Sequence, residues 1–204
     1  ACAESGRRVG YVSSLHVYGL QWGVEVEPWR EEAPLKGRGA YAVAKRAGEE
    51  FLLAGSPALC LRLGHVYGRP EGHGVVDRFL GAVQRGEDLV VTGTGLHRWS
   101  LISIRDLVAD ILRLIEGART GVLNVATHAP RLLDLAQTVR SLGERLGYPG
   151  GVIRHTSTLT DPSCVLDLSR LTEIVGPVPV GPSASLASAL SRYLPTRRVE
   201  TERR

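Results

Sequence analysis

The chain has 204 residues, of which 43% are hydrophobic and 23% charged, and its mean hydropathy is −0.02. This composition is typical of a globular protein and excludes a collagen, a coiled coil or a disordered segment, and no apolar run reaches the ~18 residues that a membrane-spanning helix needs. The net charge of +4 is spread along the sequence and not gathered in a basic stripe, which argues against nucleic acid as a partner.

The chain begins in an unusual way. Residues 1–5 have the pattern of the last turn of a helix, and Gly6 is a typical residue after a helix end. The apolar residues 9–12 predict a short strand that leads to Ser13 and Ser14. The start of the sequence contains no positively charged segment followed by an apolar stretch, so a signal peptide is not predicted here. We therefore expect a fragment whose front half is missing.

Strands and helices are expected to alternate along the rest of the chain. Residues 20–39, which hold Pro, Gly and charges without periodicity, predict a long loop. Helices are predicted at residues 40–54, 75–85, 106–116, 132–146, 167–175 and 183–193. Strands are predicted at residues 58–63, 89–92, 101–104, 122–126 and 152–155, with a Gly-rich connection at 64–74. This alternation predicts an α/β protein with parallel strands.

The cysteines give no sign of a disulfide framework or a metal centre. Cys2, Cys60 and Cys164 are odd in number and have none of the short Cys or His spacings that bind zinc. No cluster of His, Asp and Glu stands at metal-ligand spacing, so no metal is expected. Reduced thiols and a cytoplasmic location follow as the simplest expectation.

Tyr41 and Lys45 are the most informative pair. Residues four apart on a helix share one side, with Cβ atoms about 5–6 Å apart. A phenol is a poor base at neutral pH, and a nearby ammonium group favours its ionised form, so this pair suits general acid–base catalysis. Only Lys36 and Lys45 among the 25 basic residues are lysines. A lysine at this place indicates a role that arginine fills badly, such as a compact hydrogen bond to a sugar hydroxyl.

Ser14 follows a predicted parallel strand, and ligands bind at the carboxyl ends of such strands. Its hydroxyl group could therefore orient a substrate oxygen beside Tyr41. A structural alternative is that Ser13 and Ser14 only cap a turn. In that case Tyr41 would pack against its surroundings and Lys45 would form a surface pair with Glu49.

Five segments, in order, resemble the extended short-chain dehydrogenase/reductases, which are also called the NAD-dependent epimerase/dehydratase family. They are VSSLHVYG at residues 12–19, EAP at 32–34, the Tyr41–Lys45 helix with Glu49 and Glu50, LRLGHVYG at 61–68, and the Gly-x-Gly turn at 93–95 with a strand and Asp106 behind it. The resemblance extends from residue 1 to about residue 193.

The resemblance implies an incomplete Rossmann-type parallel sheet with a small C-terminal α/β substrate-capping domain. Residues 1–67 would be the C-terminal part of the NAD(P)-binding domain. Residues 68–194 would be mainly the substrate-binding domain, with crossings back to the first domain, and residues 195–204 a polar tail.

The resemblance also implies residue roles. Tyr41 would be the acid/base at the substrate hydroxyl or carbonyl, Ser14 would hydrogen-bond the reacting oxygen, and Lys45 would hold the nicotinamide ribose and stabilise the phenolate. The cofactor, NAD or NADP, would be contacted by Ser13, Tyr41, Lys45, Gly64, His65 and Val66.

Several positions depart from the family's pattern. The glycine-rich first turn is absent, so we expect this polypeptide to bind a dinucleotide weakly or not at all. Leu15 and His16 stand where dehydratases of the family have an acidic pair, which disfavours 4,6-dehydration, and His16 is either structural or a further acid/base. His65 stands where many members have Asn.

The expected diphosphate clamp is also altered. Trp99 occupies the place of the arginine that binds the diphosphate in nucleotide-sugar members, with Arg98 beside it. A guanidinium group can bind a phosphate and an indole cannot. Either Arg98 reaches the substrate, or the substrate has no diphosphate and Trp99 contacts it or packs beneath the loop.

The expected function is NAD(P)-dependent epimerisation or oxidoreduction at a hydroxyl or keto group of a sugar-like substrate, with nucleotide sugars as one candidate class. The alternatives are a reductase of a non-sugar carbonyl compound and a non-catalytic remnant that lacks the cofactor half. Relatives dimerise through the Tyr–Lys helix and the helix before it, so a homodimer is conceivable only for a full-length protein.

Overall fold

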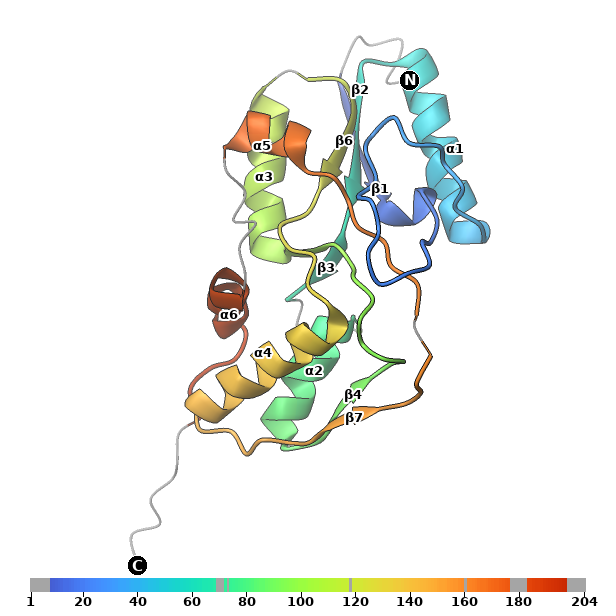
Figure 1. The fold of residues 1–204 in the computed structure, drawn as a ribbon. Helices are drawn as coiled ribbons and strands as arrows, with labels where there is room; N and C mark the ends of the chain where they lie inside the picture. Colours follow the sequence, from blue (N-terminus) through green and yellow to red (C-terminus); the bar gives the residue numbers. More distant parts are fainter. Residues whose placement is uncertain are drawn as a thin grey trace, which may run out of the picture.

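Three small parallel sheets organise the chain in the computed structural model, which describes residues 8–68, 72, 74–117, 119–159, 161–176 and 183–197 (Figure 1). Their strands are β1 (Val9–Ser14), β2 (Ala58–Leu63), β3 (His65–Tyr67), β4 (Leu89–Val91), β5 (Leu101–Ser103), β6 (Gly121–Val125) and β7 (Ile153–His155). The pairs are β1 with β2, β2 with β6, β3 with β5 and β4 with β7.

Helices separate most of these strands. They are η1 (Leu15–Val17), a single 3₁₀ turn, and α1 (Ala40–Gly55), α2 (Val75–Arg85), α3 (Ile104–Glu116), α4 (Leu132–Arg145), α5 (Ser169–Val175) and α6 (Ser183–Ser191). The α/β class with parallel pairing predicted from the sequence is therefore confirmed. None of the described helices has the length and hydropathy to cross a membrane.

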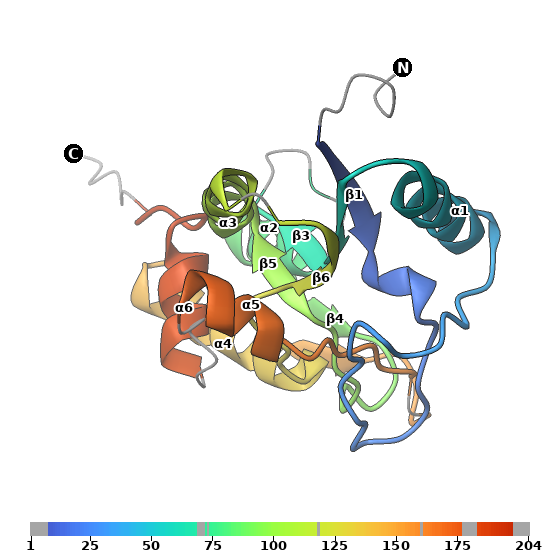
Figure 2. The same ribbon diagram turned by 90° about the horizontal axis from the view of Figure 1, so that it is seen from above.

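The sheet β1-β2-β6 is covered by helices on both faces. Helix α1 packs against β1 and β2 on one side, and α3 and α5 pack on the other (Figure 2). Every residue of β2 is buried, as expected of a central strand with helices on both faces, and all of them except Arg62 are apolar. Leu59, Leu61 and Leu63 contribute to the core shared with α3 and α5.

A second core lies below this sheet in Figure 1, where α2 and α4 pack against β4 and α6 packs against α4. Phe79 and Leu80 of α2, Val139 of α4 and Leu190 of α6 are buried in it. Helices α2 and α4 each contact β4, and α4 contacts both other helices. After the strands and helices of the second core, β6 returns to the first sheet, so the chain crosses between the two cores. The domain boundary at residue 68 stays a prediction.

Most predicted elements appear within two residues of their expected ends, and α2 and β2 have the predicted bounds. Strand β3 was not expected, because it lies in the segment predicted as a Gly-rich connection and is defined by its pairing with β5. Helix α3 begins two residues early, since the Ser103 side chain accepts a hydrogen bond from the Asp106 amide and caps the helix there. The helix expected at residues 1–5 lies outside the described residues.

A buried ion pair connects α1 to the central strand. Glu49 on α1 and Arg62 on β2 are 1% and 4% exposed, and their side chains form hydrogen bonds of 2.6, 3.0 and 3.1 Å. The Ser13 hydroxyl group at the end of β1 also donates to Glu49. These contacts fix the helix over both strands, because a buried charge without its partner is costly.

Replacing Glu49 with Ala should lower the free energy of unfolding by about 3–5 kcal/mol, because Arg62 then stays buried without a counter-charge. The matched control is Glu50→Ala, which removes an exposed pair with Arg46 and should cost less than ~1 kcal/mol. Urea unfolding of both variants measures the difference. Equal losses at the two neighbouring positions would contradict this account of the ion pair.

Candidate functional site

Helix α1 presents Tyr41 and Lys45 at its N-terminal end, beside β1. The Lys45 ammonium group donates a 2.8 Å hydrogen bond to the carbonyl oxygen of Val12 on β1. It lies 5.7 Å from the centroid of the Tyr41 ring, whose side chain is 56% exposed. The two residues are therefore neighbours, as the i, i+4 spacing predicts.

Tyr11, which the sequence analysis did not single out, completes the surroundings of Lys45. Its ring centroid lies 5.3 Å from the ammonium nitrogen, so the charge has an aromatic ring on each of two elements. A Cβ atom at position 48 would collide with the Tyr11 hydroxyl group, so Gly48 is what lets this ring lie against α1. The sequence does contain one indication of this contact. A glycine within a helix lowers helix stability, so its presence at position 48 indicates that another group packs closely there.

The alternative surface pairing of Lys45 with Glu49 is wrong, because Glu49 is buried and bound to Arg62. The expectation that Tyr41 packs is also not met, given its exposure. Ser14 does cap a turn: its side chain accepts a 3.3 Å hydrogen bond from the His16 amide at the start of η1. The Ser13 hydroxyl group is turned to Glu49. The predicted ligand contacts of both serines stay predictions.

Two histidines and Trp99 gather next to Tyr41. The His16 ring makes edge contacts with Tyr41, His65 and Trp99, with centroid distances of 5.9, 5.3 and 5.8 Å. His65 and Trp99 are 4.8 Å apart. Gly64 lets the chain pass here, since a Cβ atom on it would lie 2.7 Å from the Ser100 carbonyl oxygen. These residues come from η1, β3 and the segment before β5.

Burial makes both histidines weak bases. It lowers the pKa of His16 below its usual 6.5. Burial, with a smaller contribution from the neighbouring His16, lowers the pKa of His65 to about 4. Both rings are therefore neutral at neutral pH, and each has one nitrogen that can accept a proton or a hydrogen bond.

The other predicted contacts are less central. Val66 packs against the core that the sheet β1-β2-β6 shares with α3 and α5. Arg98 is partly buried, and its Nε donates a 2.8 Å hydrogen bond to the carbonyl oxygen of Ala129. Trp99 packs against two hydrophobic clusters and also lines the cavity described next, so packing and pocket contact both apply to it.

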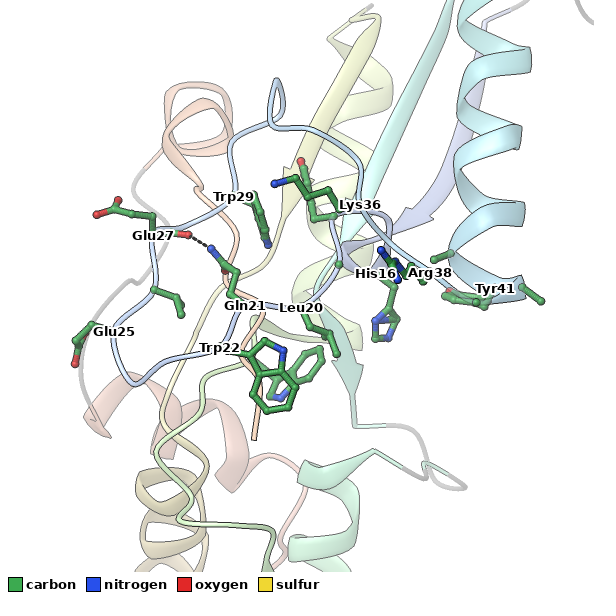
Figure 3. A pocket seen from close by; sticks show the side chains of 17 residues that line it. His16, Leu20, Gln21, Trp22, Glu25, Glu27, Trp29, Lys36, Arg38 and Tyr41 are labelled. Atoms are coloured by element: carbon green, nitrogen blue, oxygen red, sulfur yellow. Dashed lines mark hydrogen bonds between the residues drawn. The ribbon is translucent and has the colours of Figure 1, made fainter. Parts of the chain in front are cut away.

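A cavity of ≈ 1130 Å³ opens beside the start of α1. Its wall includes His16, Tyr41 and Trp99, and the long loop supplies much of the rest, including the exposed Trp22 and the cations Lys36 and Arg38. Figure 3 shows the loop curving around the opening opposite Tyr41 (Figure 3). The long loop was predicted from the sequence, and its contribution to a pocket was not.

The described residues contain no group of three or more His, Cys, Asp or Glu side chains arranged to hold a metal ion. The titratable groups at the cavity are instead two phenols, an imidazole, carboxylates and cations, which suit proton transfer and hydrogen bonding to a polar organic ligand.

Comparisons with known proteins bear on the family and the fold of the chain. Residues 1–126 match the sequence model of the NAD dependent epimerase/dehydratase family. The chain is 30% identical over 140 residues to a dTDP-4-dehydro-6-deoxy-D-allose reductase from Streptomyces bikiniensis, a match that covers 65% of this chain and 41% of that protein. The chain thus spans about two fifths of the curated relatives that it matches.

Solved structures share the fold. A dTDP-glucose 4,6-dehydratase from Bacillus anthracis in complex with NAD matches 91% of this chain and 61% of its own, with a TM-score of 0.74 and 19% identity. A UDP-N-acetylglucosamine 4-epimerase from Methanobrevibacter ruminantium in complex with UDP-N-acetylmuramic acid matches 95% of this chain and 63% of its own, with a TM-score of 0.75 and 21% identity. The Rossmann-like α/β fold is therefore confirmed.

The two neutral histidines predict a pH dependence of stability. Below pH 6.5 the unfolded chain takes up a proton on His65 and the folded chain does so only near pH 4, so the unfolding free energy falls as the pH falls through this window. The loss due to His65 should be about 3 kcal/mol between pH 7 and pH 4. His65→Asn should remove that part of the slope, as measured by urea unfolding across the pH range.

The matched control for this test is His155→Asn, which changes an exposed histidine on β7 and should retain the slope of the unchanged protein. A His65→Asn protein with an unaltered slope would show that this ring is not held neutral by the fold.

Proposed function

The chain belongs to the NAD-dependent epimerase/dehydratase family, and we propose that it carries the proton-transfer site of an NAD(P)-dependent epimerase or oxidoreductase. The substrate would be a hydroxyl or keto group of a sugar-like compound, with nucleotide sugars favoured because the relatives named above act on dTDP- and UDP-sugars. The observation that carries the proposal is the Lys45 ammonium group, held on a strand carbonyl beside the exposed Tyr41 at the cavity.

Three side chains would share the chemistry at the reacting oxygen. Tyr41 gives a proton to the oxygen or takes it away, and it is exposed on the cavity wall as this role requires. Lys45 stabilises the phenolate form of Tyr41 by its charge. Ser14 orients the same oxygen from the end of β1, where its hydroxyl group keeps the capacity to donate a hydrogen bond while it accepts one from the His16 amide.

The donor set fits the nicotinamide end of NAD or NADP. An ammonium group has three donors and Lys45 uses one of them on Val12, so two stay available for ribose hydroxyl groups. Gly64, His65 and Val66 follow β2 at the same edge of the sheet, and with Ser13 they are the further proposed cofactor contacts. When bound, the cofactor supplies the hydride acceptor or donor.

The cavity fits a substrate of this class in size and lining. Its volume lies slightly above the usual range for small-molecule sites, which suits a large polar ligand. Lys36 and Arg38 bring positive charge for an anionic part of the ligand, and Trp22 offers a flat apolar surface on which a sugar or base ring can stack.

A second candidate is the reduction of a carbonyl compound that is not a sugar nucleotide. Trp99 faces the cavity at the place where the resemblance expects a diphosphate-binding arginine, and the Nε of Arg98 is bound to Ala129. Comparing turnover of dTDP- or UDP-linked keto sugars with that of simple ketones separates the two candidates. Redox-neutral isomerisation supports an epimerase, and net oxidation of NAD(P)H supports a reductase.

Replacing Tyr41 with Phe tests the proposal in the protein as its gene encodes it, with any residues that precede Ala1. Loss of a general acid–base group should lower kcat by about 10²–10⁴-fold with little change in stability, because the Tyr41 side chain is largely exposed. Lys45→Met should also lower kcat strongly, since the phenolate loses its counter-charge. Turnover of a nucleotide sugar with NAD or NADP measures both effects.

The control is Tyr148→Phe, which removes a hydroxyl group that binds the Pro195 carbonyl outside the cavity and should leave turnover unchanged. Undiminished turnover in Tyr41→Phe would overturn the assignment of the acid/base. A protein that shows no turnover before any substitution would favour the non-catalytic remnant.

A further inference from the structure

Two positively charged side chains lie on the wall of the cavity without a counter-charge. Lys36 and Arg38 are exposed and both line the cavity. Within the part of the chain that the structure describes, neither side chain forms an ion pair or a hydrogen bond. By contrast, Arg46 on the neighbouring helix α1 is paired with Glu50. The two cations at the cavity are therefore available to bind an anion.

The backbone that carries these cations is fixed against η1. The Lys36 amide donates a 3.2 Å hydrogen bond to the carbonyl oxygen of Tyr18, and the Gly37 amide donates a 2.9 Å hydrogen bond to that of Val17. A Cβ atom at position 37 would lie 2.1 Å from the carbonyl oxygen of His16, so a glycine is needed for this close approach. Both charged side chains thus project from a backbone that is held beside the cavity.

The wall of the cavity also contains two carboxylates, and these lie away from the cations. Glu25 forms an ion pair of 2.9 Å with Arg131, and Glu27 is exposed. Figure 3 shows both carboxylates on the side of the view away from Tyr41, whereas Arg38 lies on the side of Tyr41. The cavity therefore has a negative end on the far arm of the long loop and a positive end at the start of α1.

Helix α1 increases the positive potential at that end. Its first turn has no acidic residue, and its N-cap residue, Gly39, has no side chain that could bind the first amide groups. The partial positive charge of a helix N-terminus is therefore not neutralised locally, and it adds to the two full charges of the loop.

The opposite wall offers no comparable charge. Trp99, which occupies the place where the family resemblance expects a diphosphate-binding arginine, is neutral and lines the cavity. Arg98 lies outside the cavity wall, and its Nε donates a hydrogen bond to the carbonyl oxygen of Ala129. An anionic ligand in this cavity would therefore meet its counter-charge at the start of α1.

We propose that Lys36 and Arg38 form an anion-binding subsite that takes a phosphate or a carboxylate group of the substrate. The proposal rests on the function proposed above and deepens it, since it makes the substrate an anion whose charge is bound by the long loop. A guanidinium group binds two oxygens of such a group at once, and an ammonium group adds a compact charge. A neutral ketone lacks the group that this subsite binds.

The anionic group has two sources among sugar nucleotides. UDP-glucose carries negative charge only on its diphosphate, whereas UDP-glucuronic acid carries a further carboxylate on the sugar ring. Because the two probes are otherwise alike, comparing their affinities separates the two sources.

The test measures the Kd of both probes by isothermal titration calorimetry, with the protein as its gene encodes it. Lys36→Gln together with Arg38→Gln removes both charges and keeps polar side chains that are exposed and unpaired in the described part of the chain, so the fold should not change. The matched control is Arg30→Gln, because Arg30 is an exposed cation of the same loop that lies outside the cavity wall.

We expect the double variant to raise the Kd of at least one probe by ~10-fold or more, and Arg30→Gln to leave both values unchanged. An increase for UDP-glucuronic acid alone assigns the subsite to the ring carboxylate, and an equal increase for both probes assigns it to the diphosphate. Unchanged Kd values for both probes, or no binding of either probe to the unchanged protein, overturn the proposal.

The salt dependence of binding keeps the test independent of any structural effect of the variant. Raising the salt from about 0.02 M to about 0.5 M should weaken binding to the unchanged protein, because counter-ions screen exposed charges. The same change should have a smaller effect on the double variant. Exchanging the two residues, with Lys36→Arg and Arg38→Lys, retains both charges and should retain most of the affinity. An equal salt effect in the unchanged protein and the double variant contradicts the subsite.

These measurements also separate the subsite from the proposed chemistry. Turnover of a sugar nucleotide with a Kd that does not depend on Lys36 and Arg38 overturns the subsite and leaves the proposed function standing. Binding that depends on both charges in a protein without turnover supports the subsite and contradicts the proposed function.

Discussion

The buried pair of Glu49 and Arg62 is the contact on which the arrangement of the proposed site depends. Glu49 lies one helical turn after Lys45 and two after Tyr41, and its carboxylate is bound by Arg62 of β2 and by Ser13 at the end of β1. A helix held in this way cannot rotate or slide without leaving a buried charge unpaired, which costs several kcal/mol. The pair therefore fixes the position of the N-terminal end of α1 relative to the end of β1.

The same guanidinium group reaches the wall of the cavity. Arg62 donates to the Tyr18 hydroxyl group and to the carbonyl oxygen of Glu31, both at 2.9 Å, and Tyr18 stacks on Trp29. Asn124 of β6 continues the network to the loop through its amide group, which donates to the carbonyl oxygen of Trp29. One buried cation thus couples the central strand, the proposed catalytic helix and the loop that lines the cavity, and in this way connects the core of the sheet to the cavity wall.

The sequence predicted the features that local patterns determine. Long periodic helices and the apolar strand β2 follow from hydrophobic spacing, and the neighbourhood of Tyr41 and Lys45 follows from the helical repeat. It did not predict β3, because this strand lies in a Gly-rich segment without a strand pattern and is defined by its pairing with β5. It also did not predict that Glu49 is buried, since glutamates are rarely buried without a partner and Arg62 is thirteen residues away. The contact of Tyr11 with Lys45 and the histidine–tryptophan group at the cavity likewise arise from tertiary packing.

The most direct test of this account is a double-mutant cycle on kcat between Glu49→Asp and Lys45→Met. Asp at position 49 retains the charge but shortens the reach to Arg62 by one methylene, so the helix must shift, and shifts of about 1 Å near a reacting centre can cost on the order of 100-fold in rate. The account predicts a loss of at least about tenfold for Glu49→Asp alone and a smaller further loss once Lys45 is already Met, because the carboxylate acts partly through the placement of Lys45 and partly through that of Tyr41. Fully multiplicative losses, or no loss from Glu49→Asp in a folded protein, would contradict it.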